Sequence, residues 1–143
     1  MTGLIIGLVA FAVLVLGWVL LWHVVFGDEL AHVWLEVQYR YDEPTEWIEL
    51  RLAPKLPRLL GHDYVTLGRL IRTRLPDALW HPEIHTPILR HEAEHTHQQR
   101  GWGYWGFWLL AYLVNPWFRK KEEAKAMERE TQLWPMIVQV RRP

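Results

Sequence analysis

The chain has 143 residues, the length of a single domain with little room for a second. Its 16 basic and 16 acidic residues balance to a formal charge of zero, so no nucleic-acid partner is expected. It contains no cysteine, which excludes disulfides, thiolate catalysis and cysteine-ligated zinc sites.

A long apolar segment begins the chain. No charged residue occurs between Gly3 and Phe26, and a helix rising ~1.5 Å per residue over this range crosses the ~30 Å hydrocarbon layer of a bilayer. Trp18 and Trp22 near its end suit the headgroup region. We predict that residues 1–27 form a single-pass membrane anchor in contact with lipid. A cleaved signal peptide is the alternative, disfavoured by the segment's length and by the lack of a basic residue before it.

The orientation of this anchor is weakly determined by the sequence. No lysine or arginine precedes the span, and Arg40 is the first one after it. The positive-inside rule therefore gives only a slight preference for a cytoplasmic location of the rest of the chain.

The next segment shows the alternation that is typical of β-strands. Apolar or aromatic residues occupy every second position over 33–41, and alternation resumes over 48–52 after a turn signal at 42–45. This pattern predicts a hairpin. Residues 64–74 are interpreted as a third strand, so an antiparallel sheet is expected.

Residues 91–95 read His-Glu-Ala-Glu-His, the HExxH pattern. Two histidines four positions apart in a helix lie one turn above each other, so the rings of His91 and His95 can reach one zinc ion. Glu92 projects beside the same ion, where it can accept a proton. The pattern predicts a zinc site, with an accidental match as the alternative.

The helix that carries the motif has recognisable boundaries. Thr86 is predicted as its N-cap, and Gly101 supplies its C-terminal stop. The motif side chains share one helical stripe with Ile88, which is unfavourable for ionisable groups unless something binds them. A solvated or core-satisfied histidine pair is the alternative.

A further protein ligand for zinc is predicted downstream. Residues 102–118 are aromatic and apolar, and a polar helix follows from about Trp117 to Trp134. Glu123 lies on the predicted inward stripe of this helix and is our choice of ligand, with Glu122 and Glu130 as alternatives. Glu122 is predicted to lie on the solvated side.

The apolar segment 102–118 must fold back for this site to form. If it crossed a bilayer, Glu123 would lie on the opposite side from His91 and His95. We therefore expect this segment to pack as core or to contact the membrane interface.

These features together resemble the minimal gluzincin-type HExxH zinc metallopeptidases. The resemblance covers about Tyr64 to Glu130. It consists of a Thr-Leu-Gly strand, the HExxH motif with a trailing Gln-Gln, a glycine- and aromatic-rich helix, and a Glu-x-x-Ala segment at 123–126. Met127 stands where the family often has an acidic residue.

The resemblance implies peptide-bond hydrolysis with Zn²⁺ as cofactor. His91, His95 and Glu123 would bind zinc, and Glu92 would be the general base on a zinc-bound water. The strand near 64–74 would be the sheet edge along which a peptide or protein substrate lies, close to the membrane. The oxyanion donor stays open among Tyr104, Tyr112, His81 and His85.

We therefore predict an α+β fold. A transmembrane helix precedes a metallopeptidase domain, residues 28–143, with an antiparallel sheet and an HExxH helix packed against two further helices. The alternative is a non-catalytic, membrane-anchored structural or assembly protein. It would hold a zinc clamp, with His81, His85 or Glu130 as a further ligand, or no metal at all.

Overall fold

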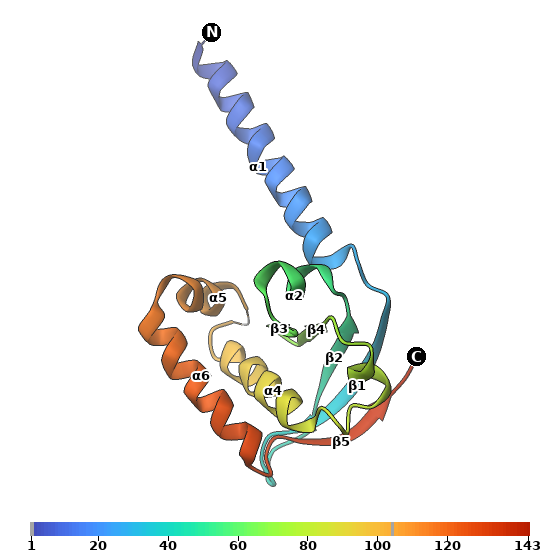
Figure 1. Cartoon of the computed structure of the whole chain (residues 1–143). Helices are drawn as coiled ribbons and strands as arrows, with labels where there is room; N and C mark the ends of the chain where they lie inside the picture. Colours follow the sequence, from blue (N-terminus) through green and yellow to red (C-terminus); the bar gives the residue numbers. More distant parts are fainter. Residues whose placement is uncertain (1, 104) are drawn as a thin grey trace.

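The computed structural model describes residues 2–103 and 105–143. It is an α+β structure in which one long apolar helix projects from a domain built of a five-stranded sheet and several helices (Figure 1). The predicted fold class, with an HExxH helix packed against two further helices, is confirmed.

The projecting helix, α1, extends from Thr2 to Phe26. Among the described residues it is the one helix that is long and apolar enough to cross a membrane. Its apolar span, Ile5–His23, is not buried against the rest of the structure. Its 25 residues give a length of about 37 Å. A signal sequence meets the same criteria.

The sheet has the strand order β3-β4-β2-β1-β5 and is antiparallel except between β2 and β4. The strands are β1 (Ala31–Gln38), β2 (Glu46–Leu52), β3 (Tyr64–Leu67), β4 (Leu70–Thr73) and β5 (Met136–Arg141). The predicted β1–β2 hairpin is confirmed, with Leu35 opposite Ile48. β5 was not predicted, and it pairs with β1 at one edge of the sheet.

The single strand predicted over 64–74 is wrong. This segment is a hairpin, in which β3 and β4 pair through Leu67 opposite Leu70 and turn at Gly68 and Arg69. Gly68 has a φ of 63°, a conformation that glycine adopts without a steric penalty and that suits a two-residue hairpin turn. The short turn leaves β3 as the edge strand beside the motif helix.

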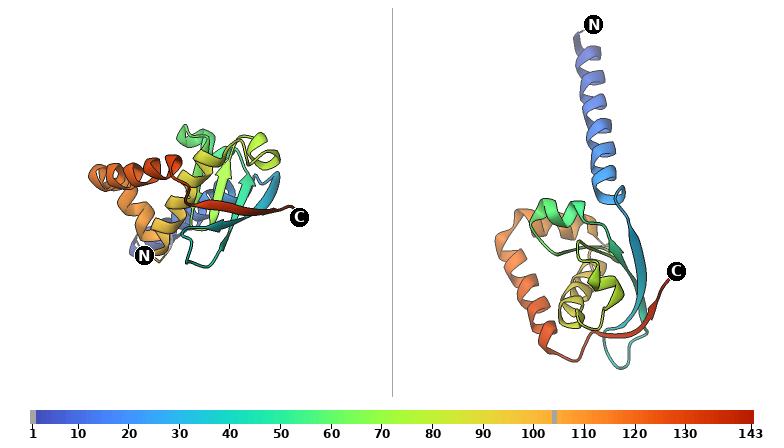
Figure 2. Two further views of the ribbon diagram at one scale, coloured as in Figure 1. Left: turned by 90° about the horizontal axis from the view of Figure 1, so that it is seen from below. Right: turned by 45° about the vertical axis from the view of Figure 1, so that its right-hand side comes forward.

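The domain's helices lie on one side of the sheet (Figure 2). They are α2 (Lys55–Leu60), α3 (Asp77–Trp80), α4 (Thr86–Arg100), α5 (Trp105–Val114) and α6 (Pro116–Thr131). The predicted N-cap of α4 is wrong, because the helix begins at Thr86 and His85 precedes it as the cap. The side chain of Asn115 caps α6 by accepting from the backbone N–H groups of Trp117 and Phe118.

The core forms between the sheet and α4. Leu35 and Ile48 from the sheet and Leu89 and Ala93 from α4 are buried in one cluster. Successive helical residues are ~100° apart, so His91 lies about 200° around the helix from Leu89. Burial of the apolar stripe therefore turns His91 and His95 toward α6, which packs along α4.

Candidate metal centre

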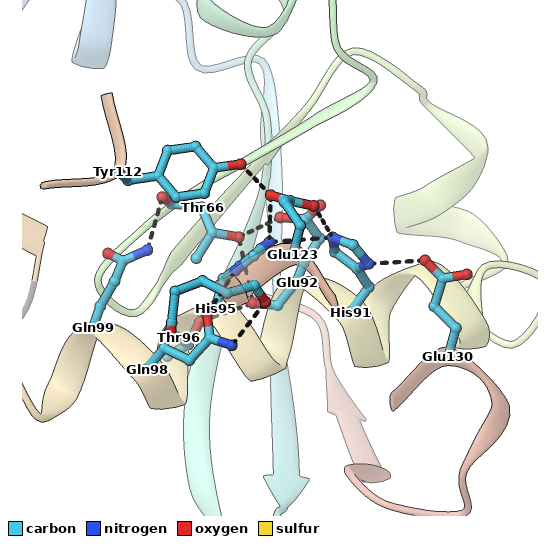
Figure 3. A network of polar contacts seen from close by, with 11 residues as sticks. Thr66, His91, Glu92, His95, Thr96, Gln98, Gln99, Tyr112, Glu123 and Glu130 are labelled. Carbon is cyan, nitrogen blue, oxygen red and sulfur yellow. Dashed lines mark hydrogen bonds and ion pairs between the residues drawn. The ribbon is translucent and has the colours of Figure 1, made fainter. Parts of the chain in front are cut away.

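The structure brings His91, His95 and Glu123 together (Figure 3). The Nε2 atoms of the two histidines are 3.1 Å apart. Glu123 Oε2 lies 3.4 Å from His91 Nε2, and its Oε1 lies 3.3 Å from His95 Nε2. The two histidines come from successive turns of α4, and the carboxylate comes from α6.

These spacings fit a tetrahedral zinc ion. Zinc binds imidazole nitrogen and carboxylate oxygen at ~2.0–2.1 Å, which places neighbouring ligand atoms of a tetrahedron about 3.3 Å apart. The two Nε2 atoms are 3.1 Å apart, and each is 3.3 to 3.4 Å from one of the two Glu123 oxygens. Two histidines and one glutamate are also a donor set of catalytic zinc sites, in which the fourth position is left open.

The Glu92 carboxylate is held beside this group by an element far away in sequence. Thr66 on β3 donates a hydrogen bond of 2.5 Å from Oγ1 to Glu92 Oε2 (Figure 3). Glu92 is only partly buried and lines the same cleft as the two histidines. Its carboxylate is therefore both oriented and accessible.

Each histidine has a hydrogen-bond partner on its other ring nitrogen. His91 Nδ1 lies 2.8 Å from Glu130 Oε1, and His95 Nδ1 lies 2.9 Å from Gln98 Oε1. Both partners are acceptors, so when the rings are neutral they favour the tautomer with the proton on Nδ1, which leaves the Nε2 lone pair free for a metal. This is the arrangement that orients imidazole toward a metal.

The charges of the group are strongly coupled. Burial lowers the pKa of His91 and His95, but hydrogen bonding to Glu123 and the negative charge of Glu92 outweigh it, and both pKa values are raised. Burial alone would raise the pKa of Glu123. Hydrogen bonds from both histidines and from Tyr112 instead hold it well below its usual range. The carboxylate is thus ionised and able to accept a cation.

The two alternative carboxylates have other partners. Glu122 is buried, where its carboxylate binds Lys125 Nζ at 2.9 Å. Its predicted position on the solvated side is wrong, because this part of α6 packs against α4 and Gln98 Nε2 donates to the Glu122 carbonyl. Glu130 contacts the outer nitrogen of His91 rather than the one that faces Glu123. Of the three candidate carboxylates, Glu123 is the one that the structure places with both Nε2 atoms.

The expected apolar character of the motif stripe is also wrong. Ile88 is exposed, so the stripe of α4 that carries the motif is not an apolar stripe. Glu94, by contrast, is buried and accepts from Arg129 Nε of α6 at 3.1 Å. This burial follows from the packing of α6 along α4, which periodicity within α4 does not reveal.

A cleft of about 840 Å³ contains the group. α4 contributes His91, Glu92, His95 and Gln99. Leu60 of α2 and three residues of β3 line one wall, and α5 and α6 line the other. The lining on those walls includes Tyr64, Val65, Thr66, Trp108, Leu109, Tyr112, Leu113, Arg119, Lys120 and Glu123.

Of the predicted oxyanion donors, Tyr112 is the one placed in the cleft lining. Its hydroxyl donates to Glu123 Oε1. Burial and then the neighbouring Glu123 raise its pKa, so the phenol stays protonated. His81 pairs with Glu83, and His85 Nδ1 lies 2.8 Å from the Tyr64 hydroxyl; neither histidine lines the cleft. Tyr104 lies outside the described residues.

Gln99 has a role that sequence reasoning missed. It is fully buried, donates from Nε2 to the Thr66 carbonyl at 3.2 Å and accepts from the Gly68 N–H at 2.6 Å. These bonds hold the edge strand β3 against α4, which in turn places Thr66 beside Glu92. The paired glutamines 98 and 99 were the available signal, but the sequence does not say what either one binds.

Comparison with known proteins gives no match. No protein-family model matches the chain, and neither the curated proteins nor the solved structures contain a match to it.

Proposed function

We propose that this protein is a membrane-anchored zinc metallopeptidase. The observation that carries the proposal is the grouping of three ligands: His91 Nε2 and His95 Nε2 are 3.1 Å apart, and each lies 3.3 to 3.4 Å from one oxygen of the Glu123 carboxylate. These separations are close to the ~3.3 Å between neighbouring ligand atoms around zinc. The adjoining Glu92 carboxylate and the 840 Å³ cleft supply a base and room for a substrate. The apolar helix α1 supports the anchor.

The metal, when bound, would supply Lewis acidity and lower the pKa of an attacking water toward ~7. Glu92 is the group that takes the water's proton and returns it to the leaving amine. Thr66 Oγ1 keeps the Glu92 carboxylate in one orientation for this transfer. Tyr112, protonated and in the cleft, can donate to the developing oxyanion once its hydroxyl turns from Glu123 Oε1.

The edge strand β3 is suited to hold the substrate. It ends the sheet on the side next to α4, and its residues Tyr64, Val65 and Thr66 line the cleft. Gln99 already binds the Thr66 carbonyl and the Gly68 N–H, so an extended peptide would add to the part of this edge before Thr66 through backbone hydrogen bonds. Arg119 and Lys120 on the opposite wall give the cleft positive charge.

A non-catalytic zinc clamp requires a fourth protein ligand. At this site the grouped ligand atoms, among the described residues, come from His91, His95 and Glu123, and neither His81 nor His85 joins them; a separate group of Glu29, His32 and Glu49 lies elsewhere. Glu130 binds the far nitrogen of His91. Three ligands with an open side facing a cleft favour catalysis over a clamp.

Metal analysis tests the proposal most directly. The full chain, purified in detergent without chelator, should carry about one zinc ion, and His91→Ala should lose it while keeping its helical content. Exposed His62→Ala is the matched control and should keep its zinc. A wild-type protein that contains no transition metal, and takes up none at neutral pH, would refute the function.

A further inference from the structure

Building on the metallopeptidase function proposed above, we propose that the end of the domain carrying α2 and α5 binds the surface of an anionic phospholipid bilayer. We further propose that the cleft takes polypeptides tethered to that same membrane, which it cuts in the segment next to the bilayer. Neither the motif nor the anchor alone specifies this substrate class.

The anchor helix leaves the domain beside α2 and α5. Both views that show α1 from the side place these two helices at the end from which it projects (Figures 1 and 2). The segment that follows α1 is held against the domain, because Asp28 accepts from the backbone N–H of Lys55 at 2.5 Å and forms an ion pair with buried Arg72. A bilayer crossed by α1 therefore lies against α2 and α5.

Apolar side chains are exposed at this end. The membrane-end patch is formed by large apolar residues that are 59% to 75% exposed: Leu59, Phe107, Leu110, Val114 and Trp117. The sequence of α5 contains no charged residue. Large apolar side chains with this exposure are unfavourable in water and are favourable at the boundary between headgroups and acyl chains.

A rim of basic residues borders the membrane-end patch. They lie on α2 and on the first turns of α6: Lys55, Arg58, Arg119, Lys120 and Lys121. All are exposed, and none forms an ion pair with a carboxylate anywhere in 2–103 or 105–143. The segments 55–60 and 105–121 contain no acidic residue, although the whole chain is neutral.

Apolar side chains bordered by unpaired cations match the chemistry of an anionic lipid surface. Lysine and arginine can reach the phosphates while the apolar residues enter the acyl region. Lys121 already lies over the ring of Trp117, with Nζ 5.7 Å from its centroid. A protein partner with an apolar patch would not by itself account for the rim.

The cleft reaches this same end of the domain. Leu60 of α2 and Leu113 of α5 lie on opposite walls of the cleft, and they are 48% and 60% exposed. Arg119 and Lys120 belong both to the basic rim and to the cleft lining. A chain that emerges from the bilayer can therefore enter between α2 and α5 and continue along β3.

The lipid contact can be measured without activity. Because the chain has no cysteine, Leu110→Cys in the full-length protein takes a single nitroxide label. In vesicles of phosphatidylcholine and phosphatidylserine, this label should be at least ~3-fold less accessible to a water-soluble nickel chelate than a label on exposed Glu128→Cys, near the far end of α6. Adding Arg58→Glu and Lys121→Glu should lower this protection in the anionic vesicles.

Two outcomes would overturn the lipid face. One is equal accessibility of the two labels in vesicles. The other is protection of the Leu110 label that persists in detergent without lipid, with a second protein co-purifying at equal stoichiometry. That result would assign the patch to a protein partner. Leu110 does not line the cleft and is exposed, so its label tests the surface without disturbing the site.

The substrate class is tested with two tethered substrates. Both carry the same cleavable sequence, either directly after a transmembrane segment or after a flexible glycine-serine spacer of about 40 residues. Wild type in the same vesicles should cut the membrane-adjacent site at least ~10-fold faster. Phe107→Glu with Leu110→Glu should bring this ratio toward one while the cleavage rate of the free peptide stays at the wild-type value.

Equal cleavage of the two tethered substrates by wild type would overturn the substrate class and leave the metallopeptidase function standing. Cleavage of neither, and of no free peptide, would refute the proposed function and the substrate class together. The nitroxide measurement would still decide the lipid face in that case.

Discussion

Thr66, on the edge strand, donates a hydrogen bond of 2.5 Å to the carboxylate of Glu92 on the motif helix. The two residues are 26 positions apart, and the bond joins the strand proposed to hold the substrate to the residue proposed to act as base. Gln99 fastens the same strand to the same helix by binding the Thr66 carbonyl. Glu92, the proposed base, and β3, the proposed substrate strand, are thus parts of one hydrogen-bonded unit.

Replacing Glu92 by glutamine should separate catalysis from metal binding. The amide keeps the size and the bond from Thr66 but cannot take the water's proton, so peptidase activity should fall at least ~10²-fold. Zinc content and thermal stability should stay near wild type. Glu128→Gln, on the exposed surface of α6, is the matched control. Wild-type rates for Glu92→Gln would disprove its role as base.

Replacing Glu123 by glutamine should weaken zinc binding itself. A neutral amide is a poor ligand, and the two histidines lose the charge that now pairs with both of their Nε2 atoms. Glu122→Gln should keep its zinc, because that carboxylate binds Lys125 instead. Titration with a competing chelator measures both variants. If Glu122→Gln loses zinc and Glu123→Gln keeps it, the ligand is Glu122 and not Glu123.

Glu130 should tune the metal site through His91. Glu130→Ala removes the acceptor at 2.8 Å from His91 Nδ1 and should weaken zinc binding by about 10- to 100-fold. Glu130→Gln retains an acceptor oxygen and should recover most of the affinity. If alanine and glutamine have the same effect, the hydrogen bond does not orient the ring.

Zinc affinity should depend on pH above the usual range of histidine. Glu123 and Glu92 raise the pKa values of His91 and His95 in the metal-free protein. Protons therefore compete with zinc until the pH exceeds those raised values, and affinity should fall as pH drops through them, by about tenfold per pH unit for each proton displaced. Glu123 stays ionised throughout, because its pKa is lowered.

This dependence is measured as log affinity against pH with a chelator of known protonation. The bend in the curve should lie above ~6.5, the ordinary pKa of histidine. A bend below that value would show that Glu123 does not pair with the histidines in solution.

The ion pair between Glu94 and Arg129 should hold α6 against α4. The Glu94 side chain is 8% exposed, and Arg129 donates to it at 3.1 Å. Arg129→Met leaves a buried carboxylate without its charged donor and should cost about 2 kcal/mol of stability, measured by thermal unfolding of the metal-free protein in detergent. Adding Glu94→Gln should recover most of the loss, because no charge is then buried. An unchanged unfolding temperature would contradict the prediction.

Local sequence patterns were enough to predict several elements of the fold. The uncharged run of α1, the alternation in β1 and β2, and the boundaries near Thr86 and Gly101 reflect interactions between residues close in the chain. The four-residue spacing of His91 and His95 places their rings together in any helix.

Tertiary structure decided what periodicity could not. The register between α4 and α6 selects Glu123 for the metal group, turns Glu130 to the outer nitrogen of His91, and buries Glu122 and Glu94. Glu122 and Glu123 are neighbours of identical chemistry, so only the packing of two helices distinguishes them. The pairing of β4 with β2 likewise leaves β3 at the edge of the sheet, and such pairing depends on contacts that one segment does not contain.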